Sequence, residues 1–315
     1  MKWLLALALA LVAGGAFAQY PSKPIRFVVG FPPGGSADPT ARALAAPLSE
    51  QLGQPVVVEN RPGGDSAIGA DYVSKAAPDG YTIFYGSSSA MVAAVALRKQ
   101  PPYDPLKDFT PVGMVGRAMQ FLYVHPDVPA KTLKEFIEHA RANPGKVNYA
   151  TGNPLAIFAY AQFMVATGTQ LTHIPYKGEG PVTTDLIAGR VQTSILSNPG
   201  GVSLAKEGRL RILAVMGNGR LSAFPEVPTF AEAGVPQVTQ LHWAGIFGPA
   251  GLPRPVVERL NKEINIALKT PQLLAQFERY AYTAEGSTPE RLAELNRDDL
   301  ALWRRLIKET NMVLE

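Results

Sequence analysis

Glycine-rich turns are the part of the sequence whose residue types and spacing best suit ligand binding. Residues 31–36 (Phe-Pro-Pro-Gly-Gly-Ser) follow a predicted strand and precede a helix predicted from about Asp38, and residues 151–153 (Thr-Gly-Asn) precede a helix predicted from about Ala156. A helix N-terminus carries unpaired backbone N–H groups and about half a positive charge, so it can hold a carboxylate without arginine or lysine. Two such turns facing each other across a cleft would grip a small anion. The alternative is that both are ordinary strand-to-helix turns.

Asp38 complicates this interpretation, because a carboxylate beside an anion site repels the ligand. Asp38 is also a favourable helix N-cap, and Pro39 suits the first helical position. The repulsion is removed if Asp38 caps its own helix, or if it reaches the ligand through a water molecule.

No catalytic signature accompanies these turns. The sequence lacks a Gly-x-Ser-x-Gly elbow, a His-Glu-x-x-His pair and a Gly-Lys-Thr phosphate loop, and its four histidines are scattered. Cysteine is absent, which excludes disulfides, thiolate metal sites and a catalytic thiol. We therefore predict a protein that is not an enzyme and that has no cofactor and no metal site, although residues far apart in the sequence can still converge into an active site.

Strand and helix patterns alternate in an order that predicts mostly parallel sheets. Strand patterns at 25–29, 56–58 and 81–85 are separated by helical patterns at 38–52 and around 70–73. A second block repeats the alternation, with strands predicted at 147–150, 173–176, 191–196 and 211–215. Such β-α-β order is typical of α/β proteins.

Two similar segments suggest how the blocks connect. Residues 121–126 and 243–249 each form an apolar strand followed by a proline-containing turn and a helical pattern. We interpret them as two crossings between domains, with coincidence as the alternative. Domain 1 is then discontinuous, residues 19–122 and 243–315, and domain 2 is residues 123–242.

The first residues predict export. Residues 1–18 combine Lys2, an apolar run of about ten residues and small residues before a cut after Ala18, which is the layout of a cleavable signal peptide. A bilayer-spanning helix needs roughly 20 apolar residues, so a retained membrane anchor is the less favoured alternative. An exported chain without a cysteine for lipid attachment favours a diffusible protein of the periplasm.

The charge balance is mildly positive. Lys and Arg number 30 against 26 Asp and Glu, a net charge of +4, and no dense basic cluster with interleaved aromatics is present. Nucleic acid is therefore not a predicted partner. The balance slightly favours anionic solutes.

A series of short motifs along the chain resembles a known family. The chain is similar, from about Tyr20 to its C-terminus, to the Bug (Bordetella uptake gene) receptors, the solute-binding component of tripartite tricarboxylate transporters. The motifs are Tyr20-Pro21-x-Lys23-Pro24-Ile25-Arg26, Val58-Glu59-Asn60-Arg61-Pro62-Gly63, Pro78-Asp79-Gly80-Tyr81-Thr82, Tyr103-Asp104-Pro105, Asn143-Pro144-Gly145-Lys146, Pro175-Tyr176-Lys177-Gly178, Val227-Pro228-Thr229 and Pro249-Ala250-Gly251.

The resemblance implies a periplasmic-binding-protein type II-like fold, with two α/β domains, a central cleft and two hinge strands. It also implies that a ligand carboxylate is held, partly through water, between the loop at 31–38 and the facing loop at 150–153, with the turn at 87–89 on the same rim. The predicted ligand contacts are Phe31, Pro33, Gly34, Gly35, Ser36, Asp38, Ser87, Ser88, Ser89, Ala150, Thr151, Gly152, Asn153, Phe158, Tyr176 and Ser197.

The sequence departs from the family pattern on the predicted wall of domain 2. Where the family has a glycine, a threonine and a histidine after Thr151-Gly152, this chain has Pro154, Leu155 and Phe158, and Ile195 and Leu196 stand where an aspartate is common. A less polar wall predicts a ligand with one carboxylate and an apolar or aromatic body rather than citrate. The alternative is that these positions belong to the core.

The resemblance implies a monomeric, extracytoplasmic receptor that captures a small mono- or dicarboxylate and delivers it to the membrane subunits of a tripartite tricarboxylate transporter. Two other functions fit the same residues. One is a receptor that presents its ligand to a membrane sensor kinase, and the other is a periplasmic esterase built on the same two-domain body.

Overall fold

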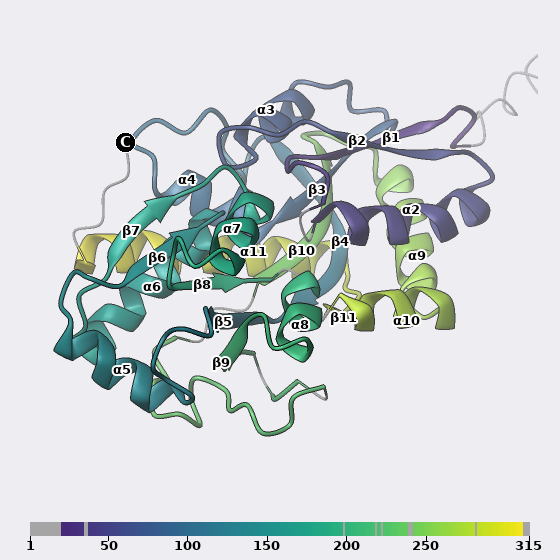
Figure 1. Ribbon diagram of the computed structural model, residues 1–315. Coiled ribbons are helices and arrows are strands. Elements are labelled where there is room, and N and C mark those ends of the chain that lie inside the picture. Colours follow the sequence, from purple (N-terminus) through teal and green to yellow (C-terminus); the bar gives the residue numbers. More distant parts are fainter. Residues whose placement is uncertain are drawn as a thin grey trace, which may run out of the picture.

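Two β-sheets organise the chain into two lobes, each with its own helices (Figure 1). The computed structural model describes residues 20–34, 37–197, 199–217, 219–221, 223–238, 242–280 and 282–310. The predicted signal peptide, residues 1–18, lies outside the described residues.

Lobe 1 is built on a six-stranded sheet of order β11-β4-β10-β3-β1-β2. Strands β1, β2 and β3 run parallel, and β10 runs antiparallel to β3 and β4. Its strands are β1 (Ile25–Val29), β2 (Val56–Asn60), β3 (Thr82–Ser87), β4 (Phe109–Ala118), β10 (His242–Pro249) and β11 (Tyr282–Ala284). Its helices are α2 (Ala37–Leu52), α3 (Ala67–Ser74), the π-helix η1 (Ser89–Ala93), α4 (Ala94–Ala96), α9 (Arg254–Ala267), α10 (Pro271–Arg279) and α11 (Pro289–Thr310).

Lobe 2 is built on a five-stranded sheet of order β7-β6-β8-β5-β9, in which β6, β7 and β8 run parallel. Its strands are β5 (Gln120–Val124), β6 (Asn148–Thr151), β7 (Thr172–Pro175), β8 (Thr193–Leu196) and β9 (Arg211–Met216). Its helices are α5 (Leu133–Ala142), α6 (Pro154–Thr167), α7 (Glu179–Ile187) and α8 (Pro199–Lys206).

The predicted alternation of strands and helices is confirmed in both lobes. In lobe 1, the four-residue spacing of Leu44, Leu48 and Leu52 places all three on the buried face of α2, against the sheet. The helix continues through Pro47. It begins at Ala37, so Asp38 lies in its first turn and is not the N-cap.

The chain changes sheets between β4 and β5, at Met119, and returns at β10. Strand β5 pairs with β8 and β9 of lobe 2, whereas β10 pairs with β3 and β4 of lobe 1. His242, the first residue of β10, pairs with Ala118, the last residue of β4, so the end of β4 lies beside the start of β10. We retain domain limits near residues 122 and 243 as a proposal.

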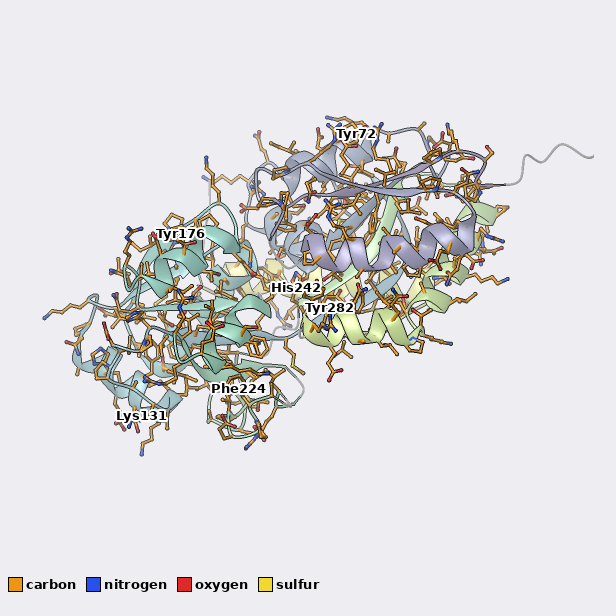
Figure 2. All side chains as sticks on the ribbon, turned by 45° about the vertical axis from the view of Figure 1, so that its right-hand side comes forward. Tyr72, Lys131, Tyr176, Phe224, His242 and Tyr282 are labelled. Carbon is orange, nitrogen blue, oxygen red and sulfur yellow. The ribbon has the colours of Figure 1, made fainter. Side chains whose placement is uncertain are left out.

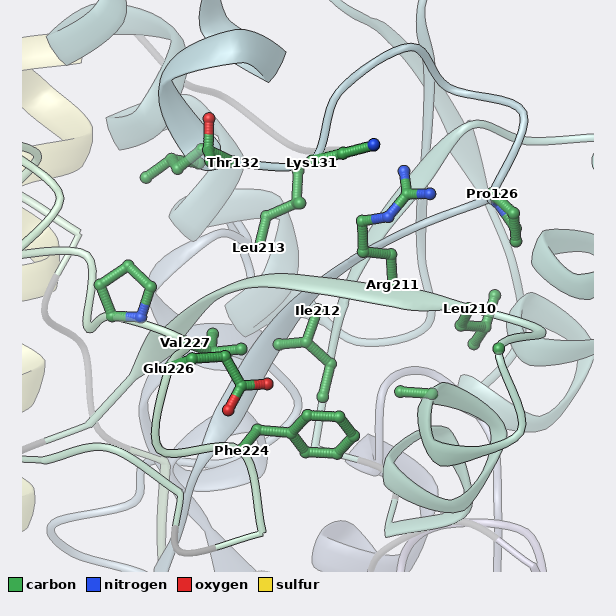
Figure 3. Close-up of a pocket in the computed structure, with 14 residues that line it drawn as sticks. Pro126, Lys131, Thr132, Leu210, Arg211, Ile212, Leu213, Phe224, Glu226 and Val227 are labelled. Atoms are coloured by element: carbon green, nitrogen blue, oxygen red, sulfur yellow. The ribbon is translucent and has the colours of Figure 1, made fainter.

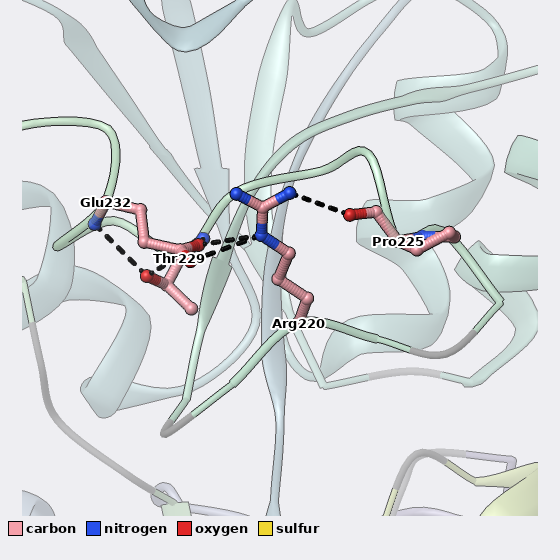
Figure 4. A network of polar contacts seen from close by, with 4 residues as sticks. All are labelled: Arg220, Pro225, Thr229 and Glu232. Atoms are coloured by element: carbon pink, nitrogen blue, oxygen red, sulfur yellow. Dashed lines mark hydrogen bonds and ion pairs between the residues drawn. The ribbon is translucent and has the colours of Figure 1, made fainter.

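The segment between β9 and β10 folds back along β9. The Phe230 amide donates to the Val215 carbonyl (3.0 Å), and the Val215 amide donates to Pro228 (2.9 Å). Figure 4 shows the polar network that closes this segment: Arg220 pairs with Glu232 at 3.0 Å, and Glu232 accepts from the Thr229 amide at 2.8 Å.

Candidate functional site

A cavity of about 180 Å³ has walls from both lobes. This volume lies below the roughly 300–1,000 Å³ of pockets for drug-sized ligands, so it suits a smaller molecule. Its lining residues are Phe31, Pro32, Pro33, Ala37, Ser89, Gly152, Asn153, Lys177, Gly178, Glu179, Gly180, Pro181, Ser197 and His242.

The wall from lobe 1 lies at the carboxyl edge of its parallel strands. The loop after β1 supplies residues 31–33, the start of α2 supplies Ala37, and η1 after β3 supplies Ser89. Because β10 is antiparallel to β3, with Ala244 opposite Ser87, its first residue, His242, lies at the same edge. Figure 2 shows His242 between the two lobes.

The wall from lobe 2 is assembled in the same way. Gly152 and Asn153 follow β6, residues 177–181 follow β7, and Ser197 follows β8. These three strands are parallel, so their carboxyl ends share one edge of the sheet. Ligand sites of α/β proteins form at this edge.

Three helices begin at the cavity: α2 from lobe 1, and α6 and α7 from lobe 2. The Asn153 side chain caps α6 by accepting from the Ala156 amide (2.9 Å), and Gly178 is the N-cap of α7. A helix start carries partial positive charge, and its first backbone N–H groups have no partner within the helix. Their convergence produces a field that favours an anion.

Two positions in this wall favour glycine, one because of a close backbone approach and one because of its positive φ. A Cβ on Gly152 would lie 2.5 Å from the Gly178 carbonyl carbon and 2.6 Å from the Glu179 nitrogen, so any larger residue would separate the two turns of lobe 2. Gly178 has φ +108°, and a Cβ there would lie 3.3 Å from Cγ of Pro32. The lobes therefore approach each other at the cavity through Gly178 and Pro32.

Glu179 is a buried carboxyl in this wall, with 7% of its surface exposed. Its Oε1 accepts from Asn153 Nδ2 (2.9 Å), Ser197 Oγ (2.8 Å) and the Ser197 amide (3.2 Å). Its Oε2 is buried without a partner in the described part of the chain. Burial raises the pKa of this carboxyl, against the lowering effect of the hydrogen bonds from Ser197 and Asn153.

His242 is the second buried titratable group of the cavity. Its Nδ1 has no hydrogen-bond partner among the described residues, and desolvation lowers its pKa to about 4. The imidazole is therefore neutral at pH 7.

Six of the predicted contacts line the cavity: Phe31, Pro33, Ser89, Gly152, Asn153 and Ser197. Gly34 adjoins the wall but is not part of it, and Gly35 and Ser36 lie outside the described residues. Residues on either side of the 34–36 turn thus face the 152–153 turn across the cavity.

The remaining predicted contacts of lobe 1 are not among the lining residues. The Asp38 carboxylate accepts from Arg42 Nε (3.0 Å) and Asn60 Nδ2 (2.9 Å). Ser87 Oγ accepts weakly from the Ala90 amide, and Ser88 Oγ is buried without a partner in the described residues.

In lobe 2, four predicted contacts have other neighbours. The Ala150 carbonyl accepts from Ser194, Thr151 Oγ1 is 2.6 Å from His173 Nε2, and Tyr176 donates to Asp185 at 2.7 Å. Phe158 packs on Trp303 of lobe 1, together with Leu155, while Ile195 and Leu196 lie in the cores of lobe 2. The positions that predicted an apolar wall are therefore core positions.

Eight lining residues were not named as contacts from the sequence. Two of them, Pro32 and Ala37, lie within the predicted loop at 31–38, and six lie outside the predicted loops: Lys177, Gly178, Glu179, Gly180, Pro181 and His242. The 177–181 turn follows a strand and opens a helix, as the two predicted turns do, so the same signal could have found it. His242 carries no comparable signal, because only the antiparallel pairing of β10 brings it to the site.

A larger cavity of about 650 Å³ lies in lobe 2, between the start of α5, β9 and the 224–228 segment (Figure 3). It is lined by one lobe, and none of the predicted contacts belongs to it. The smaller cavity is the better candidate, because both lobes and three helix N-termini meet there.

The described residues contain no group of three or more His, Asp or Glu side chains placed to hold a metal ion. None of their helices is long and apolar enough to cross a bilayer.

Two α/β lobes joined side by side, with a cavity at their junction, define a periplasmic-binding-protein type II-like solute-binding fold. The chain belongs to the tripartite tricarboxylate transporter family receptors, whose family model matches residues 40–312. It is 37% identical over 300 residues to the protein BugT of Bordetella pertussis, covering 94% of this chain and 92% of BugT. The resemblance to the Bug receptors is therefore confirmed.

Two solved structures show the same fold. Rpa4515 of R. palustris, solved with adipate, matches with a TM-score of 0.88 at 31% identity, covering 93% of this chain and 98% of its own. MatC from Rhodopseudomonas palustris, with bound malate, matches with a TM-score of 0.85 at 29% identity, covering 91% and 100%. The predicted fold class is confirmed.

Proposed function

We propose that this chain is an exported, periplasmic receptor that binds a small carboxylate in the cavity between its lobes and delivers it to the membrane subunits of a tripartite tricarboxylate transporter. The convergence of three helix N-termini from two lobes carries the proposal. The helix N-termini supply positive potential and N–H donors that can bind a carboxylate, and this binding needs no catalytic group.

Binding the carboxylate is the task of the helix starts. The first turn of α2 faces those of α6 and α7, and Lys177, which has no ion-pair partner in the described chain, adds a cation at the wall. Hydrogen bonds to a charged group contribute roughly 1.5–3 kcal/mol each. A few of them, less the cost of closure, are enough for a micromolar affinity, about −8 kcal/mol.

The ligand body is short. Phe31, Pro32 and Pro33 of lobe 1, with Pro181 of lobe 2, supply the apolar part of the wall. Relatives solved with adipate and malate support a small carboxylate as the ligand class. An apolar body remains part of the proposal, but it rests on these four residues and not on Leu155, Phe158, Ile195 or Leu196.

Capture of the ligand requires the two lobes to move toward each other. A Cβ on Gly178 would lie 3.3 Å from Cγ of Pro32, so these residues of the two lobes lie close together at the cavity, and a ligand held by both lobes would favour this arrangement. The membrane subunits would then recognise the closed form, in which the lobes have one fixed relative position. A ligand stabilises the closed state only by its difference in affinity between the two states.

A thermal-shift screen tests the function. The protein from residue 19 onward is heated with short-chain carboxylates and, as matched controls, their neutral amides. At 100 times the dissociation constant, binding adds about 2.7 kcal/mol, which raises the midpoint by several degrees. We expect shifts with acids and none with amides. Equal shifts with the amides, or no shift with any acid, would contradict the proposal.

A further inference from the structure

One oxygen atom joins the three turns that form the wall of lobe 2. Oε1 of Glu179 accepts from Asn153 Nδ2 (2.9 Å) in the turn after β6, and from the Ser197 hydroxyl (2.8 Å) and amide (3.2 Å) after β8. Glu179 itself follows β7, as the first residue of α7. A single acceptor therefore links the carboxyl ends of three parallel strands.

The side-chain amide of Asn153 is fixed at both ends. Its Oδ1 accepts from the Ala156 amide (2.9 Å) and so caps α6, while its Nδ2 donates to Glu179. Turning the amide over would place oxygen against oxygen and donor against donor. The cap of α6 and the bond to Glu179 therefore depend on each other.

The carboxyl of Glu179 lies behind the wall and holds residues that form its surface. The residue is 7% exposed, and its Oε2 is buried. Asn153, Gly178 and Ser197 line the cavity. Because burying a carboxyl is unfavourable by itself, its three hydrogen bonds are what keep it in place. Glu179 can thus set where these lining residues lie without contacting a ligand through its carboxyl group.

We propose that Glu179 is a positioning residue for carboxylate binding: it holds the starts of α6 and α7 and the end of β8 in the binding arrangement before the ligand arrives. This inference rests on the proposed function, because it concerns the same cavity. The close approach of Gly152 to Gly178 and Glu179 holds two of the turns, and the bonds from Ser197 add the third. A preformed wall avoids the free-energy cost of ordering these turns on binding.

Two variants separate the geometry of Glu179 from its charge. Glu179→Gln keeps the length of the side chain, and its amide oxygen can accept all three hydrogen bonds, but the negative charge is lost. Glu179→Asp keeps the charge, but its carboxylate is one methylene shorter and draws back from Asn153 and Ser197.

Glu232→Asp is the matched control in lobe 2. Glu232 also joins parts of the chain, since its Oε2 accepts from the Thr229 amide (2.8 Å) and pairs with Arg220 (3.0 Å), but it does not line the cavity. Shortening it should lower the melting temperature and leave carboxylate affinity unchanged.

Isothermal titration calorimetry at neutral pH measures the effect on binding. The probes are malate, adipate and any acid that raises the midpoint in the thermal-shift screen. We expect Glu179→Asp to weaken binding about ten-fold or more, because displaced donors are left buried and unpaired. Glu179→Gln should bind at least as tightly as the wild type, since the arrangement is kept and a negative charge beside the anion is removed.

Two further measurements report on the link itself. In the ligand-free protein, hydrogen exchange of the Ser197 amide should be faster in Glu179→Asp than in the wild type or Glu179→Gln. Asn153→Ser keeps a cap for α6 but loses the bond to Glu179, so it should weaken binding in the wild type and add little to the loss in Glu179→Asp.

The outcomes separate the positioning role from the function. Wild-type affinity in Glu179→Asp, an equal loss in Glu179→Gln or Glu232→Asp, or additive losses with Asn153→Ser overturn the role of Glu179 and leave the carboxylate receptor intact. Faster exchange of the Ser197 amide without weaker binding does the same. If no carboxylate of the screen binds the wild type, both proposals fail.

Discussion

The ring of Phe158 in α6 packs on the indole of Trp303 in α11, with centroids 4.1 Å apart and ring planes at 33°. Phe158 belongs to lobe 2 and Trp303 to lobe 1, and both are buried at 1% exposure. Leu155 belongs to the same core cluster, as does Met91 of η1. The first turns of α6 therefore pack in the core of lobe 1, and this packing positions the end of α6 at the cavity.

Replacing Phe158 tests this anchor. We expect Phe158→Ala to lower the free energy of unfolding by roughly 3–5 kcal/mol and to change the tryptophan emission, because Trp303 loses its aromatic neighbour. Phe163→Ala is the control, since Phe163 is buried in the core of lobe 2. It should be similarly destabilising but leave the emission unchanged. Indistinguishable emission from both variants would argue against the anchor.

Most of the fold follows from local patterns. The run at 25–29 and the leucine spacing in 38–52 predicted β1 and α2, because alternation and four-residue spacing reflect burial on one face. Strand β4 was not predicted, since it contains Pro111, Gly113 and Gly116. Its glycines are explained only by tertiary contacts: a Cβ on Gly113 would lie 2.6 Å from Asn261 Nδ2, and one on Gly116 would lie 2.1 Å from the Thr283 carbonyl oxygen.

The site was predictable as turns but not as side chains. Residues 31–33 and 152–153 were found because glycine and proline turns before helices have a recognisable pattern. Phe158 and Tyr176 were placed at the site by position in the family pattern, whereas packing on Trp303 and a hydrogen bond to Asp185 determine where they lie. His242 reaches the cavity through strand pairing across distant segments, which no local pattern encodes.

Gly152→Ala tests the close approach of the two turns in lobe 2. The added methyl would lie 2.5–2.6 Å from the backbone of Gly178 and Glu179, so the turns must separate. We expect a loss of about 1–3 kcal/mol in stability and a clear loss of carboxylate affinity. Gly180→Ala is the matched control for stability, because nothing lies within 4 Å of its Cβ. Thermal denaturation and calorimetry should show Gly180→Ala at least as stable as the wild type, and a stable, fully binding Gly152→Ala would refute the argument.

His242 predicts a loss of stability in acid. Its pKa is lowered from 6.5 to about 4 in the folded protein by desolvation, so the unfolded chain takes up the proton first. The stabilising contribution is present above pH 6.5 and is lost as the pH falls toward 4, up to about 3 kcal/mol. Denaturant titrations across this window should show a smaller loss of stability for His242→Gln than for the wild type. Parallel pH profiles would contradict the burial of a neutral imidazole.

The buried carboxyl of Glu179 should give stability the opposite pH dependence. Burial raises its pKa above the ordinary value of 4.5, so the folded protein binds this proton more tightly than the unfolded chain does. The free energy of unfolding therefore falls as the pH rises through the folded pKa. Glu179→Gln removes this cost, and we expect the ligand-free variant to melt at a higher temperature than the wild type at pH 8, with the difference shrinking toward zero below pH 4.5. Tyr123→Phe is the control, because burial and the charge on Glu179 raise the pKa of Tyr123 well above this range. A difference between Glu179→Gln and the wild type that stays constant with pH would mean that the carboxyl is not charged in the empty cavity.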